Sequence, residues 1–426
     1  MSLLPLTIEK PAAGGRMIAR HDGQIVLVSG AIPGEQVLAR VEYAKGGVVY
    51  ASVTQVESPS PDRREVAGDP ACGGNVYAHI ASGRQRVLKG EIVADAFRRI
   101  GRVTLDEPVQ VRPSPEAGYR MRARLHVRGS RIGFFREGTH DLCDAGRTAQ
   151  LLPGTTAFLG ELSERLGASG VHAVRELELA ENVPATERAV LIELAPGSDA
   201  VPHTVLSALD LPAASGLLVV RTDAPDRSAS RGRPFVTDIL TLPAEGTDVR
   251  FTIRRHVASF FQGNRYLLGT LVDAVTARVP PGPVVELYAG AGLFGLACAA
   301  LKRGSVVAVE ADRHSSQDLK DNARPFGKDV RVVGASVEAF LSRERVPPDA
   351  TLLVDPPRTG MSRDATAAMI VAGTKRLVYV SCDVATLARD VRRLMDGGYR
   401  LEHIEAFDLF PNTAHVESLV VLSRPN

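Results

Sequence analysis

The 426-residue chain has no tryptophan, only four cysteines and 5% aromatic residues. Four scattered cysteines do not make the disulfide framework of a small secreted protein, so we expect a reducing, cytoplasmic compartment. No stretch approaches the roughly 18 consecutive apolar residues of a membrane span, so we expect no membrane partner. The short apolar run at the N-terminus lacks a basic segment before it and a small-residue cleavage site, so we expect no signal peptide.

The net charge of +2 says little about partners, but the charges are unevenly distributed. Residues 84–136 hold 13 Lys and Arg against 5 Asp and Glu, an excess of 8 positive charges. Such a segment is either a solvated arginine-rich surface or a face that binds phosphates, and charge alone does not choose between them. A length of 426 residues is too great for a single core and predicts two or three domains.

The first two parts of the chain are rich in β-type segments. Residues 1–60 contain short, β-branched stretches separated by turns, which is typical of a five-stranded OB-type barrel that binds RNA. Residues 61–248 begin with a linker and a segment, 84–101, whose apolar residues recur at helical spacing and which we expect to end with Gly101 as its C-cap. The remainder predicts a mixed, mostly antiparallel α+β central domain.

From residue 249 onward, strands alternate with helices. This rhythm predicts a doubly wound, Rossmann-like α/β domain over residues 249–426. In such sheets, ligands bind at the carboxyl ends of the parallel strands. Glu310, Asp355 and Cys382 all fall at such ends, as does a glycine-rich turn. The expected strands are residues 284–288, 305–310, 352–355 and 377–380.

The glycine-rich turn, YAGAGLFG, has Gly290, Gly292 and Gly295 in G-x-G-x-x-G spacing, and Glu310 closes the next strand. Glycine lets the backbone approach a ligand, and the acidic side chain can accept hydrogen bonds from two ribose hydroxyls. The pattern fits NAD-dependent dehydrogenases as well as S-adenosylmethionine enzymes, and tight packing alone also produces it. By itself the turn indicates a nucleotide cofactor without selecting one.

Two later strands end in residues with reactive side chains. In LLVDPPRTG, Asp355 precedes two prolines that stiffen the exit from the strand, although a simple rigid turn would look the same. Cys382 follows the next strand, and we expect Asp383 to cap the helix after it. A thiol at a helix N-terminus should have its thiolate favoured. Cys298, within an apolar helix, is expected to be a core residue.

Two polar segments remain as candidates. In FDLFPNTAHVESLVVLSR, Glu417 follows a proline turn and precedes an apolar strand, where it could serve as a general base. A lone acid before a strand is more commonly a solvated residue. Gln262 and Asn264 follow two aromatic residues and precede a helix, and helix capping explains them equally well.

Taken together, these segments resemble the RNA uracil-5-methyltransferase family, which makes 5-methyluridine in transfer or ribosomal RNA. Residues 1–60 resemble its TRAM domain, and SFFQGN, ELYAGAGLFGLA, DPPRTG, SCDVATLARD and FDLFPNTAHVESL follow in the family's order. The resemblance implies an S-adenosylmethionine-dependent enzyme acting on RNA, which we expect to be a monomer. It implies that Cys382 adds to carbon 6 of uracil and that Glu417 removes the carbon 5 proton. The implied cofactor-binding residues are Gln262, Tyr288, Gly290, Gly292, Glu310 and Asp355.

The chain departs from the family at three sites, one of which is Leu293, where a polar residue is common. Many members hold an iron–sulfur cluster on four cysteines, but only Cys72 matches here, with Val66, Asn75 and Thr148 near the other positions, so we predict no cluster. Asp383 stands where asparagine is usual, and its charge opposes thiolate formation. Two alternatives stay open: an RNA-binding member of the family with decayed catalysis, and a cytosine-C5 methyltransferase.

Overall fold

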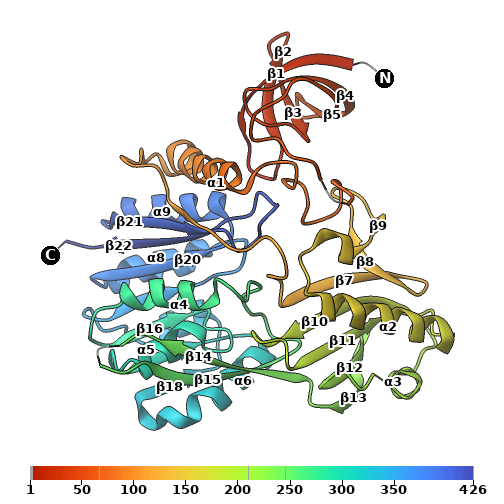
Figure 1. The fold of residues 1–426 in the computed structure, drawn as a ribbon. Helices are drawn as coiled ribbons and strands as arrows, with labels where there is room; N and C mark the ends of the chain where they lie inside the picture. Colours follow the sequence, from red (N-terminus) through yellow and green to blue (C-terminus); the bar gives the residue numbers. More distant parts are fainter. Residues whose placement is uncertain (1–2, 67, 210, 245, 426) are drawn as a thin grey trace.

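The computed structural model describes residues 3–66, 68–209, 211–244 and 246–425. Figure 1 shows three parts: a barrel at the N-terminus, a central sheet with its helices, and an α/β part that contains the C-terminus. The helix α1 lies between the barrel and the α/β part (Figure 1). No helix in the described ranges is long and apolar enough to cross a membrane.

The N-terminal part is a closed five-stranded barrel in the order β1-β2-β3-β5-β4, which confirms the predicted OB-type fold. Alternate residues of its strands, such as Ile8, Val26 and Val37, fill the interior because successive side chains point to opposite faces. The buried carboxylate of Glu35 accepts a 2.6 Å hydrogen bond from Arg63, which ties the barrel to the following linker. The strands are β1 (Leu3–Pro11), β2 (Met17–His21), β3 (Gln24–Ser29), β4 (Gln36–Lys45) and β5 (Val48–Ser58).

The linker helix α1 (Ser82–Ala96) runs directly into a single π-helical turn (Phe97–Gly101). The expected helix is therefore present, but its predicted C-cap is wrong. Arg102, with φ of 54°, adopts the left-handed conformation that ends the segment, and Gly101 is the last residue of the turn. The apolar side chains of this segment pack in one core with α9 (Val384–Asp396), which follows the candidate nucleophile.

The central part contains a seven-stranded sheet in the order β13-β12-β11-β10-β7-β8-β9. Only the β11–β12 pair is parallel among its pairings, which confirms the mixed, mostly antiparallel prediction. The helices α2 (Pro153–Ser169) and α3 (Pro202–Ala208) contribute apolar residues to its core. The strands are β7 (Arg122–Arg128), β8 (Arg131–Phe135), β9 (Leu142–Cys143), β10 (Val174–Glu181), β11 (Arg188–Leu194), β12 (Gly216–Arg221) and β13 (Ala224–Gly232).

The α/β part has an eight-stranded sheet in the order β18-β17-β16-β19-β20-β22-β21-β6. Its first five strands are parallel and β22 is antiparallel to β20, which confirms the predicted Rossmann-like domain. The strands are β16 (Val284–Leu287), β17 (Val306–Val309), β18 (Val330–Val333), β19 (Thr351–Val354), β20 (Arg376–Ser381), β21 (Arg400–Phe407), β22 (Glu417–Ser423) and β6 (Val111–Arg112). The helices besides α9 are α4 (Leu268–Ala277), α5 (Leu293–Ala300), α6 (Arg313–Ala323), α7 (Val337–Arg343) and α8 (Arg363–Ala372).

Two segments from before residue 249 also belong to the α/β core. β6 extends the eight-stranded sheet beyond β21. A separate two-stranded ribbon, β14 (Phe235–Leu242) with β15 (Val249–His256), buries Leu240 and Phe251 in the same core as α4. In Figure 1 this ribbon runs below the sheet towards the central part. The ribbon therefore packs in the α/β core while it extends towards the central part.

Candidate active site

Three polar residues meet at the carboxyl edge of the eight-stranded sheet. Asp355 follows β19, Cys382 follows β20, and Glu417 is the first residue of β22. These strands are neighbours, and Ser381 pairs with Ser418 in the antiparallel ladder between β20 and β22. Because β22 starts where β20 ends, the chain places Glu417 beside Cys382 although 35 positions separate them in the sequence.

The surroundings of Cys382 disfavour its thiolate form. Burial raises the pKa of the Cys382 thiol to about 12, and the carboxylates of Glu417 and Asp355 contribute to this rise, while Arg358 lowers the pKa. The expectation that the helix N-terminus would favour the thiolate is therefore wrong, since burial and two nearby acids outweigh it. Cys382 is half-buried and makes no disulfide.

Asp383 caps α9 as predicted. Its carboxylate accepts a 2.8 Å hydrogen bond from the backbone N–H of Thr386. The charges that raise the pKa of Cys382 are those of Glu417 and Asp355, and Asp383 is not among the causes. The acids that disfavour the Cys382 thiolate are therefore Glu417 and Asp355, rather than Asp383 as the sequence suggested.

The pKa values of both acids are raised as well. Burial and the charge of Asp355 raise the pKa of Glu417 well above its ordinary value, and Arg358 lowers it. Burial raises the pKa of Asp355 to about 7, against a hydrogen bond from Gln262 that lowers it. The Nε2 atom of Gln262 donates to Oδ2 of Asp355 at 3.3 Å. Titratable groups with such shifted pKa values in one place are characteristic of active sites.

The candidate cofactor residues surround the same edge. After β16, Tyr288 has φ of 61°, Gly290 of 57° and Gly292 of 97°, so the turn is left-handed at three positions. Such a conformation is costly for a tyrosine and is typically retained where function requires it. Apart from Gly290 and its two neighbours in the chain, no described residue has a heavy atom within 4 Å of the position that a Gly290 side chain would start from, which leaves that side of the turn open. Glu310 accepts 2.7 Å hydrogen bonds from the backbone N–H groups of Gly290 and Asp312.

Sequence reasoning missed Glu286, which lies inside β16 beneath this turn. Its side chain is fully buried, and burial, followed by the charges of Asp355 and Glu310, raises its pKa to about 8. Its Oε2 atom has no hydrogen-bond partner among the described residues, and a side chain on Gly295 would approach that atom to 2.2 Å. A glutamate within the apolar run VVEL was the available signal.

The loop that leads to Glu417 is held by side chains of α1 and of the segment before α4. Lys89 of α1 forms a buried ion pair with Asp408. Gln85 donates a 2.8 Å hydrogen bond to the Asn412 side chain and accepts one from its backbone N–H. Asn264 donates to the carbonyl of Leu409 at 2.9 Å. The Asn264 side chain also accepts hydrogen bonds from the backbone N–H groups of Tyr266 and Leu267 in the turn before α4, but the N-cap residue of that helix is Leu267, so the capping interpretation is wrong.

The four cysteines have different environments. Cys72 and Cys143, which are buried and 71 positions apart, form a disulfide, so Cys72 is a structural residue. Cys298 is fully buried in the core, as predicted. Within the described part of the chain, no group of three or more His, Cys, Asp and Glu side chains is placed to hold a metal ion. The absence of an iron–sulfur cluster and the cytoplasmic compartment stay predictions.

The basic segment is less positive in space than in sequence. Acidic residues from outside residues 84–136 pair with many of its cations. These ion pairs offset part of the excess positive charge of the segment. The pairs are Lys89–Asp408, Arg112–Glu405, Arg122–Glu178, Arg124–Glu176 and Arg136–Asp69.

Comparison with known proteins gives consistent similarities. The TRAM domain pattern matches residues 2–54, and the tRNA (Uracil-5-)-methyltransferase pattern matches residues 348–425. An uncharacterized RNA methyltransferase of Streptomyces avermitilis is 31% identical over 437 residues, covering 96% of each chain. The 23S rRNA (uracil(1939)-C(5))-methyltransferase RlmD of Pseudomonas entomophila is 31% identical and covers 98% of this chain and 92% of its own.

A solved structure shares the fold along almost the whole chain. The tRNA (uracil-54, C5)-methyltransferase of Pyrococcus abyssi, in complex with S-adenosyl-L-homocysteine, matches with a TM-score of 0.75 at 24% identity. The match covers 98% of this chain and 99% of that one. That match shows the shared fold, and the sequence relatives show that the chain belongs to the RNA uracil-5-methyltransferase family.

Proposed function

We propose that this protein transfers a methyl group from S-adenosylmethionine to carbon 5 of a specific uridine in ribosomal or transfer RNA. The observation that carries the proposal is the meeting of a free thiol, Cys382, with Glu417 and Asp355 at one sheet edge. Family membership supplies the class of reaction, and these three side chains supply groups with the chemistry that it needs.

Carbon 5 of uracil is a poor nucleophile, so the protein must activate it. The Cys382 thiolate adds to carbon 6, and the electron pair of the C5=C6 bond moves to form an enolate in which carbon 5 is nucleophilic. S-adenosylmethionine, when bound, supplies the electrophilic methyl group. Glu417 then takes the proton from carbon 5, and the carbon–sulfur bond breaks to restore the C5=C6 bond and the thiolate.

The shifted pKa values suit both steps once the ionised forms exist. A thiolate whose pKa is about 12 is rare at neutral pH but strongly nucleophilic. A carboxylate whose pKa is raised is a better proton acceptor than an ordinary one, which suits Glu417. Arg358 lowers the pKa of both groups and is the nearby cation that stabilises the charged site.

The residues at the turn after β16 fit the cofactor. The open side of Gly290 allows close approach of a ligand, and Glu310, at the end of β17, retains lone pairs for ribose hydroxyls. Gln262, Tyr288, Gly292 and Asp355 complete the proposed binding residues. A base stacked within RNA cannot reach this edge, so the target nucleotide must be flipped out of its stack.

The test is to map 5-methyluridine by mass spectrometry in RNA from a strain that lacks this protein and from its parent. We expect loss at one position, restored by the wild-type gene and by Cys298→Ala but not by Cys382→Ala. Unchanged 5-methyluridine in the deletion strain would overturn the proposal. Restoration of methylation by Cys382→Ala would overturn the covalent mechanism.

A further inference from the structure

Three arginines of the central part lie on one face of the chain and differ in their partners. Arg120, Arg122 and Arg124 are spaced by two residues, and side chains at this spacing in an extended segment point to the same side. Arg122 lies 3.0 Å from Glu178, and Arg124 pairs with Glu176. Among the described residues, no carboxylate lies within ion-pair distance of Arg120, so its charge is uncompensated by the protein.

Aromatic rings surround the Arg120 guanidinium instead of acids. Its central carbon lies 5.5 Å from the ring centres of Phe134 and Phe410 and 6.0 Å from that of Tyr119. Rings at this distance attract and immobilise a cation without neutralising it. The Arg120 Nε atom is buried and has no hydrogen-bond partner in the described chain. The cation is thus held in place and still lacks a counter-charge.

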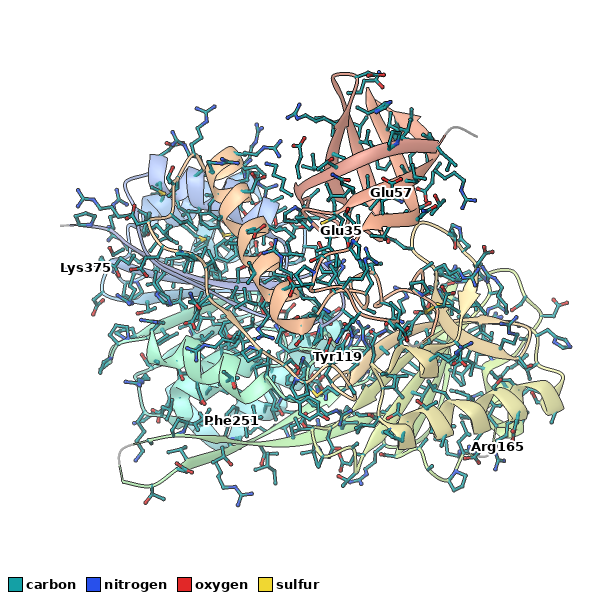
Figure 2. All side chains as sticks on the ribbon, turned by 45° about the horizontal axis from the view of Figure 1, so that its top comes forward. Glu35, Glu57, Tyr119, Arg165, Phe251 and Lys375 are labelled. Carbon is teal, nitrogen blue, oxygen red and sulfur yellow. A yellow bond between two sulfur atoms is a disulfide. The ribbon has the colours of Figure 1, made fainter. Side chains whose placement is uncertain are left out.

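The position of Arg120 connects the central part with the active-site loop. Its backbone N–H donates to Gln150 at 2.9 Å, and it forms an isolated β-bridge with Asn264. Phe410 belongs to the loop that leads to Glu417. Burial lowers the pKa of His415 in the same loop, and the positive charge of Arg120 contributes to that decrease. Figure 2 places Tyr119, the preceding residue, near the middle of the molecule where α1 meets the central part.

We propose that Arg120 binds a backbone phosphate of the RNA beside the nucleotide that enters the active site. The inference rests on the proposed function, because RNA is the polyanion that this site would receive. A guanidinium offers a planar fork of N–H donors that matches phosphate oxygens. Arg122 and Arg124 are paired with glutamates, whereas Arg120 is not, so Arg120 is the arginine of the three that adds electrostatic affinity for RNA.

The test is a salt titration of RNA binding in wild type, Arg120→Ala, Arg120→Lys and the matched control Arg124→Ala. The probe is a single-stranded oligouridylate, and binding is measured without S-adenosylmethionine. Loss of one phosphate contact should reduce the slope of log K against log salt by about 0.7 in Arg120→Ala, because fewer counterions are released. Arg120→Lys should keep the slope, and Arg124→Ala should leave it unchanged.

Kinetics on RNA from the deletion strain separate this role from a structural one. Arg120→Ala should raise KM for RNA about tenfold, as a lost charged contact does, with kcat within about twofold of wild type. Equal slopes for Arg120→Ala and wild type, or a fall in kcat with unchanged KM, would overturn the proposal. If the wild-type protein transfers no methyl group, the proposed function is wrong. The salt dependence of RNA binding still tests whether Arg120 contacts a phosphate. A shared slope loss in Arg124→Ala would also count against it.

Discussion

The buried acids of the central sheet and those at the edge of the methyltransferase sheet have different neighbours. In the central part, Glu181 is fully buried and receives both Arg188 and Arg265, each with a hydrogen bond of 2.7 Å. At the edge of the methyltransferase sheet, Asp355 and Glu417 lie together and raise the pKa of Cys382, with Arg358 as the opposing cation. One region places opposite charges together, and the other places like charges together.

This difference separates structural from functional polar groups. A buried acid paired with two arginines holds together the segments that carry the three side chains. Buried acids that lie close together have raised pKa values, so they can exchange protons near neutral pH. Such an arrangement is unfavourable for stability and is typical of catalytic sites. Sulfur follows the same division, because Cys72 and Cys143 are bonded to each other in the central part while Cys382 is free at the sheet edge.

The largest expected effect comes from the unpaired thiol. Cys382→Ala should lower methyl transfer by a factor of about a thousand or more, as removal of a covalent nucleophile does. The thermal midpoint should stay near that of wild type, because no bonded partner is lost. Cys298→Ala, which removes the buried free thiol, is the matched control and should retain activity. A radiometric methyl-transfer assay and a melting curve decide between these outcomes.

The paired acid should show the reverse behaviour. Glu181→Ala leaves Arg188 and Arg265 without their carboxylate and should cost about 3–5 kcal/mol of unfolding free energy, the usual penalty for breaking a buried pair. Urea unfolding followed by circular dichroism measures it. The control Arg124→Ala removes a half-exposed partner and should cost less than about 1 kcal/mol. Equal losses in the two variants would abolish the distinction between buried and exposed pairs.

The disulfide should contribute somewhat less. Because the bond closes a loop of 71 positions, Cys72→Ser should reduce the free energy of unfolding by about 2–4 kcal/mol, mainly through the unfolded chain. Cys143→Ser should match it, and the double variant should lose no more than either single one. Methyl transfer at low temperature should persist. Additive losses in the double variant would show that the two sulfurs are not bonded in solution.

The smallest expected effect is a change in pH dependence at the unpaired cluster. Since the thiolate is the reactive form and the Cys382 pKa is raised to about 12, the rate of Cys382 alkylation should rise about tenfold per pH unit through the neutral range. Asp355→Asn removes one of the charges that raise this pKa, so the alkylation profile should move to lower pH. Thr374 lies just before the start of β20, at the opposite end of the strand from Cys382, so Thr374→Ala should leave the profile in place. A profile that moves to higher pH in Asp355→Asn contradicts the assigned cause.

Local pattern was sufficient to predict the groups at the ends of strands. The strands that carry Asp355 and Cys382 are short apolar runs between helices, so their carboxyl ends could be located from periodicity alone. The helix cap at Asp383 follows from local backbone chemistry in the same way. The roles of Cys382 and Glu417 depended on the family resemblance, and they stay proposals.

The features that sequence could not supply depend on contacts between distant segments. The Cys72–Cys143 bond, the β6 edge strand and the glutamates that neutralise Arg122 and Arg124 all join positions far apart in the chain. The pKa of Cys382 was predicted in the wrong direction because the helix N-terminus is local, whereas Glu417 is brought in by the sheet. Long-range pairing therefore determines the electrostatics of the site.

The central claim is that Cys382 bonds to uracil and that Glu417 permits its release. Glu417→Gln should be incubated with S-adenosylmethionine and RNA from the deletion strain, then digested and analysed by mass spectrometry. Glutamine cannot take the carbon 5 proton, so the carbon–sulfur bond should persist and a peptide containing Cys382 should carry a methylated uridine nucleotide. Release of 5-methyluridine at the wild-type rate with no such adduct would contradict the account.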